Sequence, residues 1–280
     1  MDKLSLILNR LSVTAGVFFS GEMCGLAHFD GTEQREGHIH LLSSGRIDVI
    51  AQNGEVVTLD KPSLIFFPKP NIHRLRATES DNATIVCASI KYGADTSNPL
   101  TNALPNMVTL SFEDDQYVEA SVNGLFDEAF HQRDGKQLVI DRLTETIIVH
   151  LLRHVMNQDT GYQGVLAGLA NKQLAKVIIE LHKSPGESWT LDSMSQLAFM
   201  SRSKFADEFR RVVGQTPGDY LIDWRVSVAQ SELKKGRPVS VVANEVGYEN
   251  SSALSKAFKR KTGLSPSAWL KDYQQINTDR

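Results

Sequence analysis

An internal repeat in the C-terminal part of the chain constrains the fold more than any other feature of the sequence. At an offset of 49 residues and without a gap, Phe205, Phe209, Gly214, Thr216 and Pro217 correspond to Leu254, Phe258, Gly263, Ser265 and Pro266. Further upstream, Met194, Leu197, Ala198 and Phe199 correspond to Ala243, Val246, Gly247 and Tyr248. Such self-similarity predicts one supersecondary unit that occurs twice.

Each copy has the pattern of a helix, a tight turn and a second helix. Thr190 is suited to cap the first helix, and Ser201 and Asn250 are good N-cap residues for the second helices. The glycines that follow, Gly214 and Gly263, suit left-handed C-terminal caps. We therefore predict helix-turn-helix units at residues 190–213 and 239–262, joined by a long helix over residues 220–235.

The outward face of each second helix combines short polar side chains with cations, which suits entry into a DNA major groove. The predicted DNA-binding residues are Arg202, Ser203, Lys204, Ala206, Asp207 and Arg210 in the first unit, and Ser251, Ser252, Ser255, Lys256, Lys259 and Arg260 in the second. Residues 167–280 contain 17 Lys and Arg against 12 Asp and Glu, whereas the rest of the chain is acidic. The alternative is a helical protein-interaction domain whose polar faces are merely solvated.

The repeat resembles the DNA-binding domain of the AraC/XylS family over about residues 172–272. The matching residues include Met200-Ser201-Arg202-Ser203-Lys204-Phe205 with Phe209-Arg210, and Phe258-Lys259 with Gly263. The resemblance implies binding to double-stranded promoter DNA, usually with activation of transcription, and RNA polymerase as a partner. By position it assigns base reading to Ser203, Ala206, Asp207, Ser251, Ser252, Ser255 and Lys256. Ala206 and Asp207 depart from the larger or basic residues often found there, so the first unit is expected to bind more weakly.

The N-terminal part has a different period. Residues 1–112 read as strands and turns, with Asn53-Gly54 marking a hairpin between two apolar runs. Residues 113–157 read as helical, with an apolar stripe over 141–156 that could serve a dimer partner or its own barrel. We predict a two-domain α+β protein: a cupin-like β-barrel or sandwich at 1–160, a linker at 161–171 and an all-α DNA-binding domain at 172–280.

Three histidines make a candidate metal site in the first domain. His38 and His40 lie on one face of a strand because side chains alternate, and His73 follows 33 residues after His40. This pattern resembles the cupin motif, and three imidazoles could hold Zn²⁺, Fe²⁺ or Ni²⁺. The glutamate that a cupin enzyme carries after the first two histidines is missing, since Leu41-Leu42-Ser43-Ser44 stand there. Structural histidines without a cofactor are the favoured interpretation, and a bound metal ion is the alternative. A cupin metalloenzyme with an appended DNA-binding domain is disfavoured, and we expect no enzyme activity.

The two cysteines are too few for a disulfide framework and favour a reducing, cytoplasmic location. Cys24 is placed near the N-terminus, and Cys87 lies in an apolar strand. With the cupin half, this arrangement resembles the RclR-like, reactive-chlorine-responsive branch of the family. The resemblance implies redox sensing, in which an oxidant such as hypochlorous acid converts one or both thiols. A small organic effector in the barrel is the alternative signal.

No apolar run is long enough to cross a bilayer. We expect the protein to form a homodimer.

Overall fold

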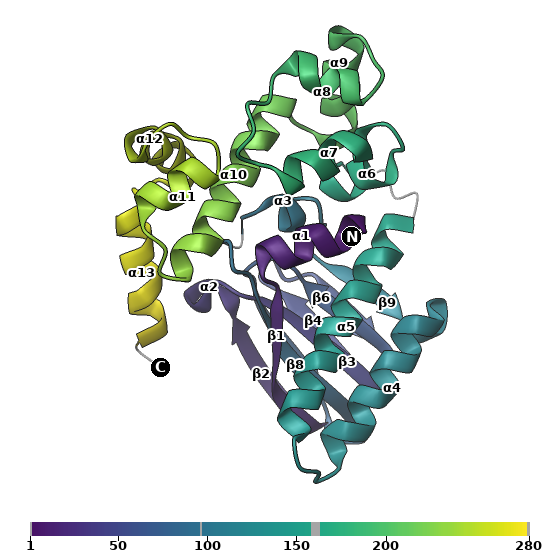
Figure 1. The fold of residues 1–280 in the computed structure, drawn as a ribbon. Helices are drawn as coiled ribbons and strands as arrows, with labels where there is room; N and C mark the ends of the chain where they lie inside the picture. Colours follow the sequence, from purple (N-terminus) through teal and green to yellow (C-terminus); the bar gives the residue numbers. More distant parts are fainter. Residues whose placement is uncertain (1, 96, 158–162, 279–280) are drawn as a thin grey trace. The chain divides into compact units, whose positions relative to one another are not determined.

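The structure, a computed structural model, describes residues 2–95, 97–157 and 163–278, which fall into two compact units (Figure 1). The unit that we call the β unit comprises Val13–Lys91 and Pro105–Gln158. The unit that we call the helical unit comprises Met1–Ser12, Tyr92–Leu104 and Asp159–Arg280. The predicted α+β class with two domains is therefore confirmed.

The β unit contains two antiparallel sheets. The five-stranded sheet has the order β1-β8-β3-β6-β9, and the four-stranded sheet has the order β2-β7-β4-β5. The strands are β1 Thr14–Met23, β2 Gly25–Asp30, β3 Gly37–Ser44, β4 Ile47–Ala51, β5 Val56–Leu59, β6 Ser63–Phe67, β7 Ile72–Ala77, β8 Ala83–Lys91 and β9 Val108–Ser111. Helix α2 (Gly31–Gln34) and a 3₁₀ turn at Glu79–Asp81 connect strands.

The hairpin predicted at Asn53-Gly54 is confirmed. β4 pairs with β5 in the register Ile47 to Leu59, and Gly54 has a φ of +84°. The two sheets enclose apolar side chains of both, among them Leu42, Ile65 and Leu75. Burial of these faces is what sets the register, because a slip by one residue would turn every side chain to the other face.

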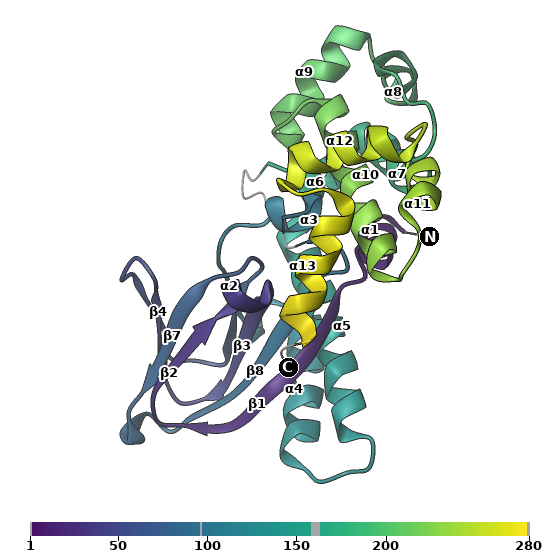
Figure 2. The ribbon, with the colours of Figure 1, turned by 90° about the vertical axis from the view of Figure 1, so that its left-hand side faces the viewer.

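Two long helices, α4 (Gln116–Phe130) and α5 (Lys136–Asn157), follow a 3₁₀ turn at Phe112–Asp114. They pack against each other and on β1 of the five-stranded sheet, as Figures 1 and 2 show. Ile147, Ile148, Leu151, Leu152 and Val155 of α5 are buried within this unit. The apolar stripe over 141–156 therefore serves packing in its own unit, the second of the two roles expected for it.

The helical unit is built around one long helix, α10 (Pro217–Lys234), with α8 and α9 near one end and α11 to α13 near the other (Figure 1). The remaining bounds are α6 Val165–Ala170, α7 Leu174–Lys183, α8 Leu191–Leu197, α9 Arg202–Val213, α11 Val239–Glu245, α12 Ser251–Thr262 and α13 Pro266–Thr278. Among the residues described, no helix is both long and apolar enough to cross a membrane.

The extreme N-terminus is helical, so the interpretation of residues 1–112 as strands and turns is wrong there. Helix α1 (Lys3–Leu11) begins after Asp2, whose carboxylate accepts from the amides of Leu4 and Ser5 at 3.1 and 2.9 Å. Leu4, Ile7 and Leu11 are buried one turn apart. The sequence contains both signals of this helix, the N-cap and the helical spacing of apolar residues. The strand patterns that follow them led to the prediction of strands for the whole segment.

A second early segment, Tyr92–Leu104, also belongs to the helical unit and contains the short helix α3 (Pro99–Asn102). The amide of Asp95 donates to Oε1 of Gln230 at 3.1 Å, and Nε1 of Trp269 donates to Oδ2 of Asp95 at 3.1 Å. Nζ of Lys234 donates to the carbonyl of Tyr92 at 3.1 Å. These contacts attach the segment to α10 and α13. The predicted first domain, residues 1–160, wrongly included it.

The linker predicted at 161–171 is only partly described, because residues 161 and 162 lie outside the described part of the chain. Residues 165–170 form α6, and Val165, Leu166 and Leu169 are buried in the helical unit. The prediction of a linker over these residues is therefore wrong. Their apolar spacing gives the short helix a face to bury, and the amide of Gly164 donates to the carbonyl of Val212 at 3.1 Å.

Candidate DNA-binding surface and histidine cluster

The second helix of each repeat is delimited by the same local interactions. Oγ of Ser201 accepts from the amide of Lys204, and Oδ1 of Asn250 accepts from the amide of Ala253, so both helices have an N-cap. At the other ends, Gly214 and Gly263 have φ values of +84° and +79°. Short-range chemistry therefore sets the length of α9 and α12.

Aromatic side chains hold both helices against the unit. Phe205 and Phe209 of α9 are fully buried and meet edge to face at a centroid distance of 5.6 Å. Phe258 of α12 is likewise buried and meets Trp269 of α13 at 5.7 Å. Because these faces are fixed inward, the opposite faces are presented to solvent.

The turns of the two repeats correct the predicted register. In the first turn the amides of Ala198, Phe199 and Met200 donate to the carbonyls of Met194, Gln196 and Ser195. The same three bonds recur in the second turn 48 residues later, from Val246, Gly247 and Tyr248 to Val242, Asn244 and Ala243. The N-caps Ser201 and Asn250, however, are 49 residues apart. The second turn is therefore one residue longer, and the ungapped offset of 49 upstream of the turn is wrong by one residue.

Most of the predicted DNA-binding residues lie on the solvent-facing side. The exposed ones are Arg202, Ser203, Lys204, Asp207 and Arg210 on α9, and Ser252, Lys256, Lys259 and Arg260 on α12; Ala206, Ser251 and Ser255 are half-buried. Nε of Arg202 pairs with Oδ1 of Asp192 at 2.7 Å. Two further cations of these helices, Arg211 and Lys261, pair with Glu208 and Asp223 at 2.7 and 2.6 Å.

Arg225 is a further candidate for a functional role, which the sequence pattern alone did not indicate. From α10, its guanidinium donates to the carbonyls of Pro185 and Glu187, both at 2.8 Å, and lies 5.6 Å from the ring centre of Tyr248. It therefore connects the loop before α8 to the turn between α11 and α12. Through these charge-assisted hydrogen bonds and the ring contact, Arg225 of α10 holds segments of both repeats in fixed positions relative to this helix.

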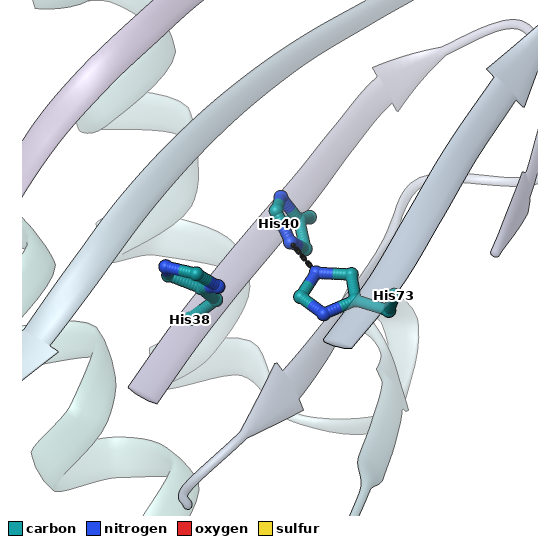
Figure 3. A group of neighbouring side chains, drawn as sticks. All are labelled: His38, His40 and His73. Atoms are coloured by element: carbon teal, nitrogen blue, oxygen red, sulfur yellow. Dashed lines mark hydrogen bonds between the residues drawn. The ribbon is translucent and has the colours of Figure 1, made fainter. Parts of the chain in front are cut away.

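In the β unit, His38 and His40 of β3 and His73 of β7 come together between the two sheets (Figure 3). All three side chains are buried, and one ring nitrogen of each lies within 4.8 Å of the others. The Nε2 atoms of His40 and His73 are 2.7 Å apart, a hydrogen-bond distance. The ring of Phe67 stacks on His73 at 4.2 Å, and Phe29 lies on its other side at 5.3 Å.

Burial keeps the imidazoles of His40 and His73 neutral. Desolvation lowers the pKa of His40 well below its usual range, and the neighbouring His73 and His38 lower it further. Desolvation likewise lowers the pKa of His73 to about 3, with a further contribution from His38. A neutral imidazole retains the lone pair that a metal requires.

The donor set fits a transition metal after a small adjustment. Two nitrogens on one tetrahedral Zn²⁺ stand roughly 3.3 Å apart at ordinary bond lengths, so the His40 and His73 rings would have to separate by about half an ångström. Nδ1 of His40 and Nδ1 of His73 are buried and have no hydrogen-bond partner. The residues thus offer three nitrogen ligands in a buried site walled by aromatic rings.

Glu36 places a carboxylate beside the histidines, on the opposite side in sequence from the position where the cupin motif carries its glutamate. It precedes His38 by two residues, is buried, and places Oε1 3.7 Å from Nε2 of His38. The positions that follow the two histidines are occupied by Leu41 and Leu42, which are buried in the core. Only the fold shows that a residue on the preceding side reaches the cluster.

The cysteines are in different surroundings. Cys24 is exposed and Cys87 is fully buried, and burial raises the pKa of the Cys87 thiol well above its usual range. Met23, the neighbour of Cys24, pairs with Ala83, which lies four residues or about 13 Å along β8 from Cys87. A disulfide requires Cα atoms within about 7 Å, and the described strands do not allow one between them.

Comparison with known proteins agrees with both units. A family model described as a cupin matches residues 2–157, and a helix-turn-helix domain model matches residues 194–272. An AraC-like transcription regulator of Streptomyces antibioticus is 30% identical over 240 residues, covering 84% of this chain and 78% of that protein. The RCS-specific HTH-type transcriptional activator RclR of Escherichia coli is 27% identical over 242 residues, covering 85% of each chain.

Two solved structures are also similar. The DNA-binding domain of AdpA, solved in complex with a target DNA, is 31% identical with a TM-score of 0.36 and covers 38% of this chain and 96% of its own. ToxT from Vibrio cholerae is 15% identical with a TM-score of 0.41 and covers 92% of this chain and 97% of its own. By its matching domains and its relatives, this chain belongs to the AraC-like family of DNA-binding transcription regulators and carries an N-terminal cupin domain.

Proposed function

We propose that the protein binds promoter DNA sequence-specifically by placing α9 and α12 in successive major grooves. The observation that carries this proposal is the pair of capped helices whose buried aromatic faces leave Ser203, Asp207, Ser252 and Lys256 toward solvent. Helix α10 has 18 residues and a length of about 27 Å. With the flanking turns, this length is of the same order as the roughly 34 Å between successive major grooves.

The two helices should contribute unequally. Lys256, Lys259 and Arg260 give α12 three exposed cations, whereas Asp207 on α9 places a carboxylate toward the groove. A carboxylate can accept from cytosine but repels phosphate. We therefore assign the larger share of the affinity to α12, and to Asp207 a preference for cytosine.

The test begins with selection of binding sequences from random double-stranded DNA by the purified full-length chain. Footprints on the selected DNA should protect two major-groove segments about one helical turn apart. Lys259→Ala should weaken binding to all sequences and reduce the salt slope by about one. Asp207→Ala should instead relax the choice at one base pair. Lys271→Ala, which removes an exposed cation of α13, is the control. Absence of binding at low salt would contradict the proposal.

We further propose that the histidine cluster binds a transition metal and that the β unit thereby responds to a signal. The support is the convergence of three buried imidazoles within 4.8 Å, with Glu36 beside His38. His38, His40 and His73 would hold the ion, and the bound ion would supply a fixed positive charge between the sheets.

Metal content and metal affinity of the full-length protein test this. His73→Gln should lower the Zn²⁺ stoichiometry well below one per chain, whereas His28→Gln, at an exposed position of β2 outside the cluster, should leave it unchanged. Equal stoichiometry in both variants would contradict a site at the cluster. A change in DNA affinity on metal removal would connect the site to regulation.

Oxidant sensing is a second candidate signal, which the similarity to the RCS-specific activator RclR supports. We propose that Cys24, the exposed thiol, reacts first and forms a sulfenic acid. A disulfide would then join Cys24 of two chains, because Cys87 lies too far away. Loss of the response to hypochlorite in Cys24→Ser but not in Cys87→Ser is the expected result. Activation rather than repression, and a homodimer, complete the proposal.

A further inference from the structure

A polar pocket lies within the helical unit, between the segment Tyr92–Leu104, α10 and the last turn of α12. Its volume is about 350 Å³, which is near the lower end of the range for small-molecule sites. Apart from Pro99 and Val226, its described lining residues all carry polar side chains. Ligand sites usually have apolar and aromatic walls, so this pocket is suited to a small and polar ligand.

Gln230 of α10 presents a hydrogen-bond donor to one end of the pocket. The residue is only 2% exposed, and its Oε1 accepts from the backbone amide of Asp95 at 3.1 Å. Because that amide can only donate, the side-chain nitrogen of Gln230 is the polar atom that remains for the pocket. Among the residues that the structure describes, none accepts a hydrogen bond from this Nε2 atom. A ligand with an acceptor at this end would satisfy it.

The carboxylate of Asp95 lines the same end of the pocket. Its Oδ2 accepts from Nε1 of Trp269 at 3.1 Å, which holds the group in place. A carboxylate has about four acceptor sites, so Asp95 can also accept from N–H groups of a ligand. One donor beside one acceptor matches a carboxamide, whose carbonyl accepts from Gln230 while its NH₂ group donates to Asp95.

An ion pair lines the other end of the pocket. Asp223 stands seven residues before Gln230 on α10, about 10 Å away along the helix. Its Oδ1 is 2.6 Å from Nζ of Lys261, and both side chains are partly exposed. A ligand with a single charge is attracted by one partner of such a pair and repelled by the other, whereas a zwitterion complements both. The ammonium has three N–H groups and the carboxylate has further acceptor sites, so the pair need not open.

We propose that this pocket binds a free amino acid with a carboxamide side chain, and that glutamine has the length to span it. The α-ammonium group lies beside Asp223, the α-carboxylate beside Lys261, and the carboxamide between Gln230 and Asp95. This inference goes beyond the proposed DNA binding, since it assigns a small-molecule site to the helical unit. Because Lys261 belongs to α12, the ligand contacts the second helix of the second repeat.

Isothermal titration calorimetry of the full-length protein without DNA tests the proposal, with L-glutamine as the probe. Wild type should show saturable binding at a single site per chain. L-glutamate, whose side-chain carboxylate Asp95 repels, and glutaramate, which lacks the α-ammonium group, should each bind about tenfold more weakly or worse. Gln230→Met and Lys261→Met should weaken glutamine binding by a similar factor. The matched control is Lys183→Met on α7, which removes a lysine paired with Glu180 at 2.7 Å outside the pocket and should leave binding unchanged.

The alternative outcomes are distinct. Absence of glutamine binding by wild type overturns the proposal, and so does equal binding of glutamine and glutamate. Glutamine binding that Lys261→Met leaves at full strength would place the ligand elsewhere and also overturn it. Melting temperatures show whether the variants fold; if Gln230→Met is unfolded, the partly exposed Lys261 decides the result. Since no DNA is present, failure of the proposed DNA binding does not affect this test.

Discussion

Replacing Gly247 by alanine should destabilise the helical unit far more than replacing Gly263, although both glycines have a left-handed backbone. Gly247 has a φ of +83° and Gly263 a φ of +79°, so the backbone strain of an added Cβ is equal at the two sites. At Gly263 the added Cβ meets nothing within 4 Å. At Gly247 it would lie 2.5 Å from Nη2 of Arg225 and 2.9 Å from the carbonyl oxygen of Gly186.

The magnitudes follow from these contacts. The strain alone costs about 1 kcal/mol, which is the full expected effect of Gly263→Ala. Gly247→Ala also displaces Arg225 from the carbonyls of Pro185 and Glu187. Each of these half-exposed hydrogen bonds contributes about 1 kcal/mol, which brings the expected total to about 3 kcal/mol. For a unit of this size the melting temperature should fall by about 3 °C and about 9 °C respectively.

Tryptophan fluorescence is the suitable assay, because all three tryptophans lie in the helical unit. In an Arg225→Ala background the cost of Gly247→Ala should fall toward that of Gly263→Ala, which a double-mutant cycle measures. Equal destabilisation by the two glycine substitutions in the native background would refute the reasoning, since strain would then be the whole effect.

Two further predictions concern the buried titratable groups. Desolvation lowers the pKa of His182 to about 3 against about 6.5 in the unfolded chain, so the folded form binds fewer protons. Stability contributed by neutral His182 is complete above pH 6.5 and is lost as the pH falls toward 3, by about 2 kcal/mol at pH 5. Tryptophan-detected denaturation at pH 7.5 and 5 should show a smaller difference in His182→Gln, and an unchanged difference would exclude this residue as the cause. Iodoacetamide should label Cys24 but not Cys87 in the native protein, because burial keeps the Cys87 thiol protonated. Mass spectrometry that finds both labelled at similar rates would contradict this.

Local chemistry made the helical unit predictable from its residues. Ser201 and Asn250 cap helices because their side chains reach amides three residues away, and Gly214 ends a helix because it accepts positive φ. The Asn53-Gly54 hairpin and the alternation of His38 and His40 are equally local. Such interactions span only a few positions, so the sequence pattern alone indicated where they form.

Other features depended on residues distant in the sequence. The apolar stripe of α5 is buried because α5 packs on α4 and β1 of its own unit. The stripe by itself would suit a second copy of the chain equally well. The assignment of Tyr92–Leu104 to the helical unit depends on hydrogen bonds of Asp95 with Gln230 and Trp269, more than 130 residues away. A one-residue difference between two turns is likewise invisible in a repeat whose positions match only in character.

By itself, then, the sequence determined the class of fold, the two helix-turn-helix units and the residues on their outer faces, because periodicity and capping are short-range. Only the tertiary structure decided that Glu36 stands beside His38, that Arg211 and Lys261 are paired with carboxylates, and that Gln230 is buried at one end of a polar pocket. The physical reason is that burial, charge pairing and exposure are properties of neighbours in space, and packing brings those neighbours together.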